Sequence, residues 1–211
     1  MARKQNRVVL KSYPGKLYFF VCEDEKSMCC YLEGMKPYLK SNLVLRARHS
    51  NNGNTAKQVY QSAKWEYDKI NKNKEAYVNG FKVIACFDKD ENDIADIKAI
   101  MNSEKKYLVS IYNNPCYEFW LYLHMKNNKP NFSSSEECAK KCLDEINAKY
   151  KKHFRNVDDL KREKNIFEIV KNDLSQAIKN AKTCDFKDYN TTYTNAHKII
   201  EEIIDLRKLK S

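Results

Sequence analysis

The sequence contains no run of apolar residues long enough to cross a bilayer, which takes about 20 residues. Its N-terminal segment, 1–16, is basic and has no apolar centre, so it lacks the pattern of a secretory signal. Internal repeats, low-complexity tracts and sustained coiled-coil heptads are also absent. We therefore expect a cytoplasmic globular protein with no membrane association, and the sequence leaves its oligomeric state open.

Zinc modules are not indicated either. The eight cysteines include no pair at the Cys-x2-Cys spacing, and the four histidines show no metal-ligand spacing with one another. Cys22 and Cys86 end two apolar runs, while Cys138 and Cys142 are one helical turn apart. We expect free thiols rather than disulfides or metal ligands.

Positive charge is in excess, with 39 Lys and Arg against 28 Asp and Glu and a formal net charge of +11. Such a balance favours polyanionic partners if the basic side chains gather on one face. The alternative is that the lysines only solvate helix surfaces. Nucleic acid is the expected partner, although charge alone does not identify it.

Apolar segments rich in β-formers alternate with helical patterns over the first part of the chain. We predict strands at 17–22, 43–47, 81–87 and 107–112, and helices at 27–39, 55–71, from Asp93 onward and at 117–124. This alternation predicts an α/β fold with a doubly wound, largely parallel sheet flanked by helices. From residue 133 onward the pattern changes to helices around 136–150, 160–180 and 194–209, without a convincing strand. We therefore predict an α/β core over 1–132 and a helical C-terminal extension over 133–211 that packs on it.

Two acidic clusters follow predicted strands directly: Glu23-Asp24-Glu25 after 17–22, and Asp88-Lys89-Asp90 after 81–87. In an open α/β sheet, ligands bind beyond the carboxyl ends of the strands, so these carboxylates can converge there. An extended backbone would point Asp88 and Asp90 to the same side and Lys89 away. Carboxylate oxygens suit Mg²⁺ or Mn²⁺, with Glu23 as a further ligand or as a proton-transfer group. The pattern favours metal-dependent phosphotransfer or nuclease chemistry; the alternative for these acids is helix capping by Asp93 or its neighbours.

Glu118 lies in the first turn of the strongly apolar helix predicted at 117–124. It is a further candidate for binding the metal or positioning water, and the alternative is a favourable interaction with the helix dipole. His124 lies about two turns farther on, which favours a core or surface histidine distant from the site.

Basic residues near the acidic loops are candidates for nucleic-acid binding. Lys26 and Lys89 belong to those loops, and Arg46 and Arg48 accompany the second predicted strand. Each could contact a phosphate of the backbone, with solvation of the surface as the alternative for Lys26.

Four motifs occur in order along the chain: 20–27 (FVCEDEKS), 86–90 (CFDKD), 114–124 (NPCYEFWLYLH) and 194–197 (TNAH). This ordered set resembles the RloB family over about residues 17–205. That family in turn resembles the Toprim (topoisomerase-primase) catalytic fold. The resemblance implies that Glu23 corresponds to the Toprim glutamate, that Asp88 and Asp90 form the magnesium-binding pair, and that Glu118 belongs to a third motif. The chain departs from the family at Asp24, where glycine is usual, and at Met28, where an acidic residue is frequent.

The same resemblance implies a biological setting. RloB-like proteins are associated with restriction-modification and phage-defence loci and often accompany an ATPase. The chain is thus expected to be a Mg²⁺- or Mn²⁺-dependent nuclease controlled by an ATPase partner, with RNA, including transfer RNA, favoured over DNA by analogy. Two alternatives stay open: a non-catalytic nucleic-acid-binding or regulatory subunit of a defence complex, and a basic helical scaffold with capping acids.

Overall fold

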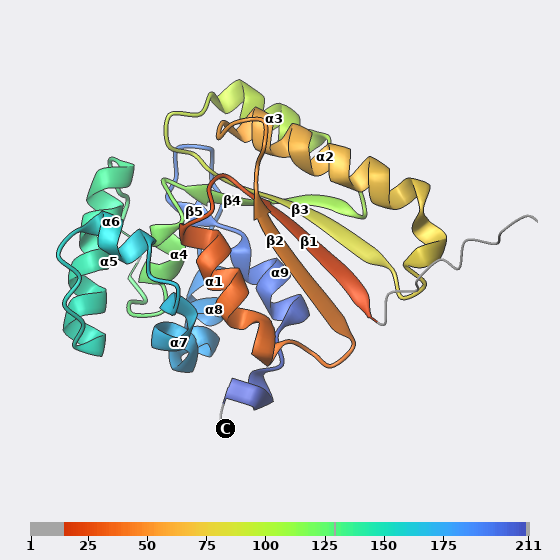
Figure 1. Cartoon of the computed structure of the whole chain (residues 1–211). Coiled ribbons are helices and arrows are strands. Elements are labelled where there is room, and N and C mark those ends of the chain that lie inside the picture. The colour runs from red at the N-terminus through yellow and green to blue at the C-terminus, as the bar shows by residue number, and fades with distance from the viewer. Residues whose placement is uncertain (1–14, 129, 210–211) are drawn as a thin grey trace, which may run out of the picture.

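The computed structural model describes residues 15–128 and 130–209. Its centre is a five-stranded sheet with the order β2-β1-β3-β4-β5 (Figure 1). The strands are β1 (Lys16–Cys22), β2 (Leu43–His49), β3 (Phe81–Asp88), β4 (Leu108–Asn114) and β5 (Tyr193–Thr194). The first four are parallel, and β5 runs antiparallel to β4. The predicted α/β class and the largely parallel sheet are confirmed.

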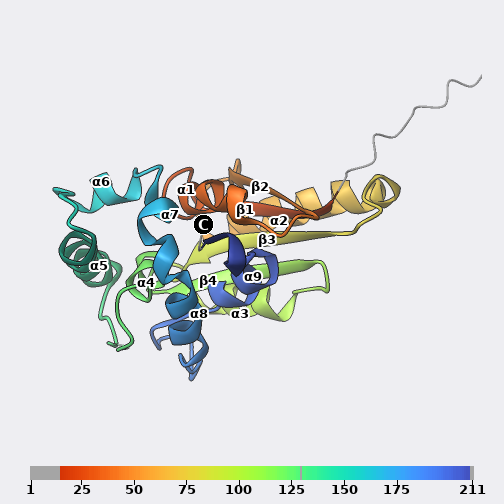
Figure 2. The ribbon, with the colours of Figure 1, turned by 90° about the horizontal axis from the view of Figure 1, so that it is seen from below.

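Helices cover both faces of the sheet. They are α1 (Ser27–Met35), α2 (Ala56–Lys72), α3 (Ile94–Asn102), α4 (Glu118–Tyr122), α5 (Ser135–Tyr150), α6 (Val157–Lys161), α7 (Ile166–Val170), α8 (Leu174–Lys182) and α9 (Ala196–Ile203), with short 3-10 turns η1 (Lys36–Tyr38), η2 (Lys74–Ala76), η3 (Lys171–Asp173) and η4 (Leu206–Leu209). Helices α2 and α3 lie on one face, and α1 and α9 lie on the other (Figures 1 and 2). Helices α4, α5 and α6 stand beyond the carboxyl ends of the central strands (Figure 1).

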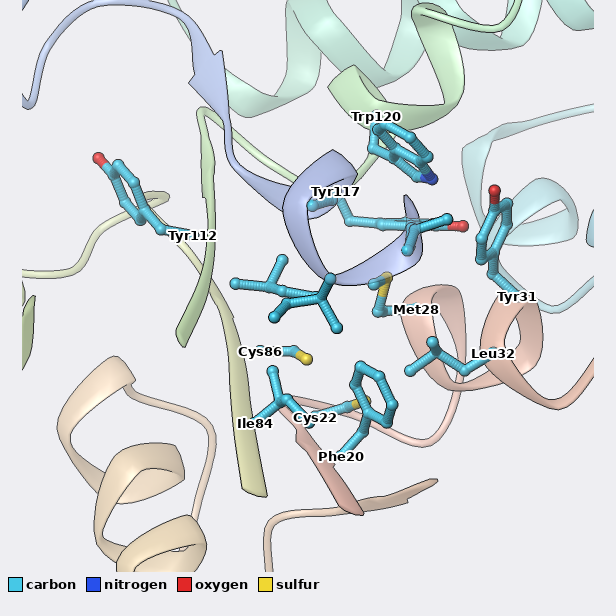
Figure 3. Close-up of a cluster of buried hydrophobic side chains, with 14 of the residues drawn as sticks. Phe20, Cys22, Met28, Tyr31, Leu32, Ile84, Cys86, Tyr112, Tyr117 and Trp120 are labelled. Carbon is cyan, nitrogen blue, oxygen red and sulfur yellow. The ribbon is translucent and has the colours of Figure 1, made fainter. Parts of the chain in front are cut away.

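The central strands are apolar on both faces, as a covered parallel sheet requires. Phe20 and Cys22 of β1 and Ile84 and Cys86 of β3 point toward α1, where Met28 meets them (Figure 3). One connected set of buried apolar side chains extends from β1 through to the end of α9. The division at 132/133 therefore stays a prediction, because the C-terminal helices share this core.

The C-terminal part differs from its prediction in two respects. The single helix expected at 160–180 is divided into α6, α7, η3 and α8. A strand is also present where none was expected, because β5 pairs with Asn113 and Asn114 of β4. Two residues are too few to produce a recognisable alternation in the sequence.

The side chain of Asn195 extends the short β5 pairing. Its Oδ1 accepts a hydrogen bond from the backbone N–H of Tyr112 over 2.8 Å, and its Nδ2 donates to the carbonyl of Ser110 over 3.1 Å. A side-chain amide thus takes the place of a backbone peptide group beside β4. This arrangement anchors the start of α9 to the sheet.

All eight cysteines are free thiols, and all except the half-buried Cys30 are buried. Cys138 and Cys142 both lie on the buried face of α5. Within 15–128 and 130–209, every helix is too short or too polar to traverse a bilayer.

Candidate active site

A cavity of about 610 Å³ opens at the carboxyl ends of β1 and β3. Its floor comes from the sheet and α4, and helices α5 and α6 supply the opposite wall. Acidic side chains from all of these segments line it: Glu23, Asp24, Asp88, Asp90, Glu118, Glu136 and Asp158. The structure therefore brings together all four predicted catalytic carboxylates.

Asp88 is the last residue of β3 and is fixed by two donors. The side-chain amide of Asn113 donates to its Oδ1 over 3.0 Å, and the backbone N–H of Tyr117 donates to its Oδ2 over 3.0 Å. Burial raises the pKa of the Asp88 carboxyl well above its usual value, and the neighbouring charges of Glu23 and Glu118 raise it further. The carboxylate is thus held in one orientation, within a field that favours a cation beside it.

Glu23 follows β1 and lies beside Asp88. Its Oε2 accepts a hydrogen bond from the backbone N–H of Asp88 over 3.2 Å, which joins the ends of two adjacent strands. Burial raises the pKa of Glu23 to about 7, with additional repulsion from Asp24 and Asp90. Glu23 and Asp88 are therefore a close pair of like charges.

Asp90 reaches the cavity in a different way from the one predicted. Its backbone has a positive φ of 29°, so the chain is no longer extended after Asp88. Aspartate tolerates this left-handed conformation better than most residues do. The backbone N–H of Asp90 donates to the carbonyl of Pro115 over 3.0 Å, and its Oδ1 accepts from the hydroxyl of Ser135 over 2.9 Å. Asp88 and Asp90 both line the cavity, but Asp90 is directed there by a turn and not by the alternation of side chains along a strand.

Glu118 lies in the first turn of its helix, as predicted, and its side chain is deeply buried. It is 2% exposed and begins α4, where its charge also meets the helix N-terminus. Its Oε1 lies 3.8 Å from Nζ of Lys161 on α6, and this carboxylate is the main cause that raises the pKa of Lys161. Lys161 is thus a cation inside an acidic cavity.

The predicted nucleic-acid-binding residues lie at separate places. Nζ of Lys26 is 3.5 Å from Asp158, beside the cavity, and Nζ of Lys89 donates to the backbone carbonyl of Asp90 over 3.1 Å. Arg48 lies on the sheet face that α2 covers, where its Nη2 is 3.0 Å from the buried Glu66. Arg46, two residues earlier on β2, is exposed on that same face. The two arginines therefore belong to the α2 side of the edge strand, outside the acidic cavity.

His124 is a core residue, as the sequence favoured. It is fully buried, its Nε2 lies 3.1 Å from the hydroxyl of Tyr31, and its Nδ1 lies 3.0 Å from the carbonyl of Trp120. Burial lowers its pKa to about 4, so the imidazole is neutral at physiological pH. Asp93 caps α3 by accepting from the backbone N–H of Ala95 over 2.6 Å, which leaves Asp88 and Asp90 without a capping role there.

The donor set suits a hard divalent cation. Carboxylate oxygens of Glu23, Asp88 and Asp90 line one cavity, where burial is the main cause that raises the pKa of Glu23 and of Asp88 and the neighbouring carboxylates add to it. Within the described part of the chain, no three His, Cys, Asp or Glu side chains already stand in a metal-binding geometry. The donor types at this cavity, and not their spacing, are those that Mg²⁺ and Mn²⁺ prefer.

Sequence reasoning missed the cavity-lining acids Glu136 and Asp158 and three residues that contact the predicted carboxylates. Asn113 orients Asp88, Ser135 holds Asp90, and Lys161 faces Glu118. Asn113 could have been found from the sequence, because it directly precedes the 114–124 motif. Ser135 and Lys161 belong to helices that are distant in sequence, and no motif marks them.

The chain was also compared with known proteins. No curated protein and no solved structure matches it. Residues 18–203 match the family model described as RloB-like protein, and this range contains every carboxylate that lines the cavity. The chain therefore belongs to the RloB-like family.

Proposed function

We propose that this protein is a metal-dependent nuclease that cleaves phosphodiester bonds in nucleic acid, with RNA, and transfer RNA in particular, favoured over DNA. The convergence of Glu23, Asp88, Asp90 and Glu118 in one cavity is the observation that carries the proposal. A chain of net charge +11 that gathers carboxylates at one point suits a polyanion bound around a metal centre.

The residues divide the work as follows. Asp88 and Asp90 would hold Mg²⁺ or Mn²⁺, and Glu23 would either complete that set or take the proton of the attacking oxygen. The cation would neutralise charge on the phosphate and favour attack by water or, in RNA, by a 2′-hydroxyl. Asn113 and the N–H of Tyr117 keep Asp88 in place, and Lys161 offers a positive charge to the phosphate oxygens.

The wider setting belongs to the same proposal. A glutamate after the first strand and an Asp-x-Asp after a later parallel strand support a Toprim-like core. Membership of the RloB-like family supports a cytoplasmic phage-defence effector whose cleavage an ATPase partner controls. The substrate preference for RNA rests on analogy with Toprim-like effectors that also work with ATPases.

The experiment compares wild type with Asp88→Asn and Asp90→Asn on total RNA and plasmid DNA. Each is incubated with Mg²⁺, Mn²⁺ or EDTA, with and without the neighbouring ATPase if the locus encodes one. Asp185→Asn, an exposed acid outside the cavity, is the matched control. Cleavage that needs the metal, survives Asp185→Asn and is lost in both site variants supports the nuclease.

The same variants also test the alternative of a regulatory subunit. Loss of association with the ATPase, without metal-dependent cleavage under any condition, would contradict the nuclease. Binding measurements on a single-stranded RNA separate loss of cleavage from loss of substrate binding.

The proposal also predicts direct metal binding. A divalent cation at ten times its dissociation constant should stabilise wild type by about 1.4 kcal/mol, because it binds only the folded cavity. Asp88→Asn should lose this gain, whereas Asp185→Asn should keep it. Thermal unfolding in EDTA and in increasing Mg²⁺ measures the difference, and equal stabilisation of Asp88→Asn would place the cation elsewhere.

A further inference from the structure

Trp65 is a large aromatic residue that the core does not use. It is 58% exposed, whereas the second tryptophan, Trp120, is fully buried. Trp65 lies on α2 within a row of exposed residues spaced by about one helical turn: Lys57, Gln61, Trp65, Lys69 and Lys72. Helix α2 therefore presents an aromatic ring flanked by lysines to solvent, on the face opposite α1 and α9 (Figure 1).

Cationic and amide groups surround this ring. Nζ of Lys69 lies 5.0 Å from its centroid, which is within cation–π range. A surface hollow of about 370 Å³ beside it is lined by Arg48, Asn51, Asn52, Gln61, Ser62 and Trp65. Nη2 of Arg48 is paired with Glu66, and its Nε is buried without a hydrogen-bond partner among the described residues, so the accessible donors are the side-chain amides of Asn51, Asn52 and Gln61. The hollow thus combines one stacking surface with several hydrogen-bond donors.

This hollow adjoins the acidic cavity through the loop after β2. A second hollow, of about 450 Å³, is lined by His49, Ser50, Gly53 and Asn54 on one side and by Glu23 to Lys26 on the other. The loop 49–54 lies between the two hollows, because Asn51 and Asn52 line the first and its other four residues line the second, while Glu23 and Asp24 line both the second hollow and the catalytic cavity. A track from Trp65 to the carboxylates would cross this loop.

We propose that the Trp65 face is a binding site for single-stranded nucleic acid, in which an unstacked base lies on the indole and the strand continues along the track to the cavity. Base stacking on an exposed aromatic and backbone contact with lysines are the two features of non-specific single-strand binding. Lysines outnumber acidic residues along α2, and this excess of positive charge favours a polyanion as the partner. The course into the cavity rests on the proposed nuclease function, whereas binding at Trp65 does not.

Tryptophan fluorescence tests the proposal in EDTA, where metal-dependent cleavage is excluded. An oligouridine of about 12 nucleotides is titrated into wild type, Trp65→Ala, Trp65→Phe and Lys69→Ala. Phe186→Ala, which removes another exposed aromatic, is the matched control. The same length of oligothymidine and an RNA duplex complete the set, and anisotropy of a labelled strand gives the affinities.

We expect single strands of both sugars to quench wild-type fluorescence and the duplex to quench it less, because its bases are already stacked. Trp65→Ala should bind single strands about tenfold more weakly, and Trp65→Phe within about threefold of wild type, since a phenyl ring still stacks. The buried Trp120 should not respond, so the quench should vanish in Trp65→Ala.

Unchanged affinity in Trp65→Ala, or an equal loss of affinity in Phe186→Ala, would contradict the nucleic-acid site. Trp65 would then be assigned to an interface with another protein. Quenching and a Trp65-dependent affinity without any cleavage by wild type would uphold this site while contradicting the nuclease. Cleavage by wild type, together with an affinity that is the same in Trp65→Ala, would uphold the nuclease and contradict the Trp65 site.

Discussion

The hydroxyl of Thr194 donates a hydrogen bond to Oδ1 of Asn113 over 2.7 Å. Asn113 uses its other amide atom, Nδ2, to donate to Asp88. A residue of the C-terminal strand β5 thus sets the orientation of the amide that holds the carboxylate at the end of β3.

Removal of this hydroxyl should loosen the site. Thr194→Val preserves the volume but leaves the buried Oδ1 of Asn113 and the N–H of Ala196 without their partner. We expect a loss of about 1–3 kcal/mol in the free energy of unfolding, the usual cost of a buried unsatisfied polar group. Urea unfolding measures it.

Thr183→Val is the control for Thr194→Val. Thr183 is exposed and its hydroxyl donates only to the carbonyl of Asn180, so its loss should cost within about 0.5 kcal/mol. Equal costs at the two positions would contradict the link from β5 to Asp88.

Lys161 should stabilise the fold by compensating Glu118. Lys161→Met leaves a carboxylate that is 2% exposed without its cation, at an expected cost of about 1–3 kcal/mol. This lies below the range for a fully buried pair, because the Lys161 side chain is 38% exposed. Adding Glu118→Gln should recover much of the loss, since no charge is then left unpaired.

A double-mutant cycle by urea unfolding gives the coupling between Lys161 and Glu118. The exposed pair of Lys182 on α8 and Glu201 on α9, 2.6 Å apart, is the matched control, and Lys182→Met should cost within about 0.5 kcal/mol. A coupling energy near zero in the first pair would mean that Glu118 is neutralised in another way.

His124 should make stability depend on pH on the acidic side. Its pKa is about 4 in the folded protein and 6.5 without burial, so its stabilising contribution is complete above pH 6.5 and is lost as the pH falls toward 4. The full difference corresponds to about 3 kcal/mol. His124→Gln should flatten the decline of stability between these values, as followed by urea unfolding at each pH.

The exposed His153 supplies the comparison for His124. His153→Gln should leave the acid-side slope of wild type unchanged. If His124→Gln has that same slope, other groups must account for the loss of stability.

The central strands and the convergence of Glu23 with Asp88 were predictable from sequence for one physical reason. A strand buried on both faces leaves a continuous apolar run, and polar residues that follow such runs lie at the same edge of a parallel sheet. That argument places Glu23 beside Asp88 without any knowledge of the helices and loops that connect β1 to β3. It does not place Lys161, because the approach of α6 to α4 depends on the packing of helices that are distant in sequence.

Local backbone detail was less accessible. Asp90 reaches the cavity through a left-handed residue, which an alternation rule cannot describe. The place of Arg48 at the second strand did not decide which face of the sheet its side chain occupies, because that depends on its partner Glu66 on α2. The strand β5 is specified mainly by the hydrogen bonds of Thr194 and Asn195, which are recognised only once β4 is in place.

The antiparallel pairing of β5 with β4 also determines when the site can form during synthesis. Glu23 and Asp88 are synthesised before Thr194, whose hydroxyl orients Asn113 from β5. A nascent or prematurely terminated chain that lacks this residue has all the predicted metal ligands and none of the support that β5 provides. The support that β5 gives to Asn113 and Asp88 is therefore added only after residue 194 has been synthesised.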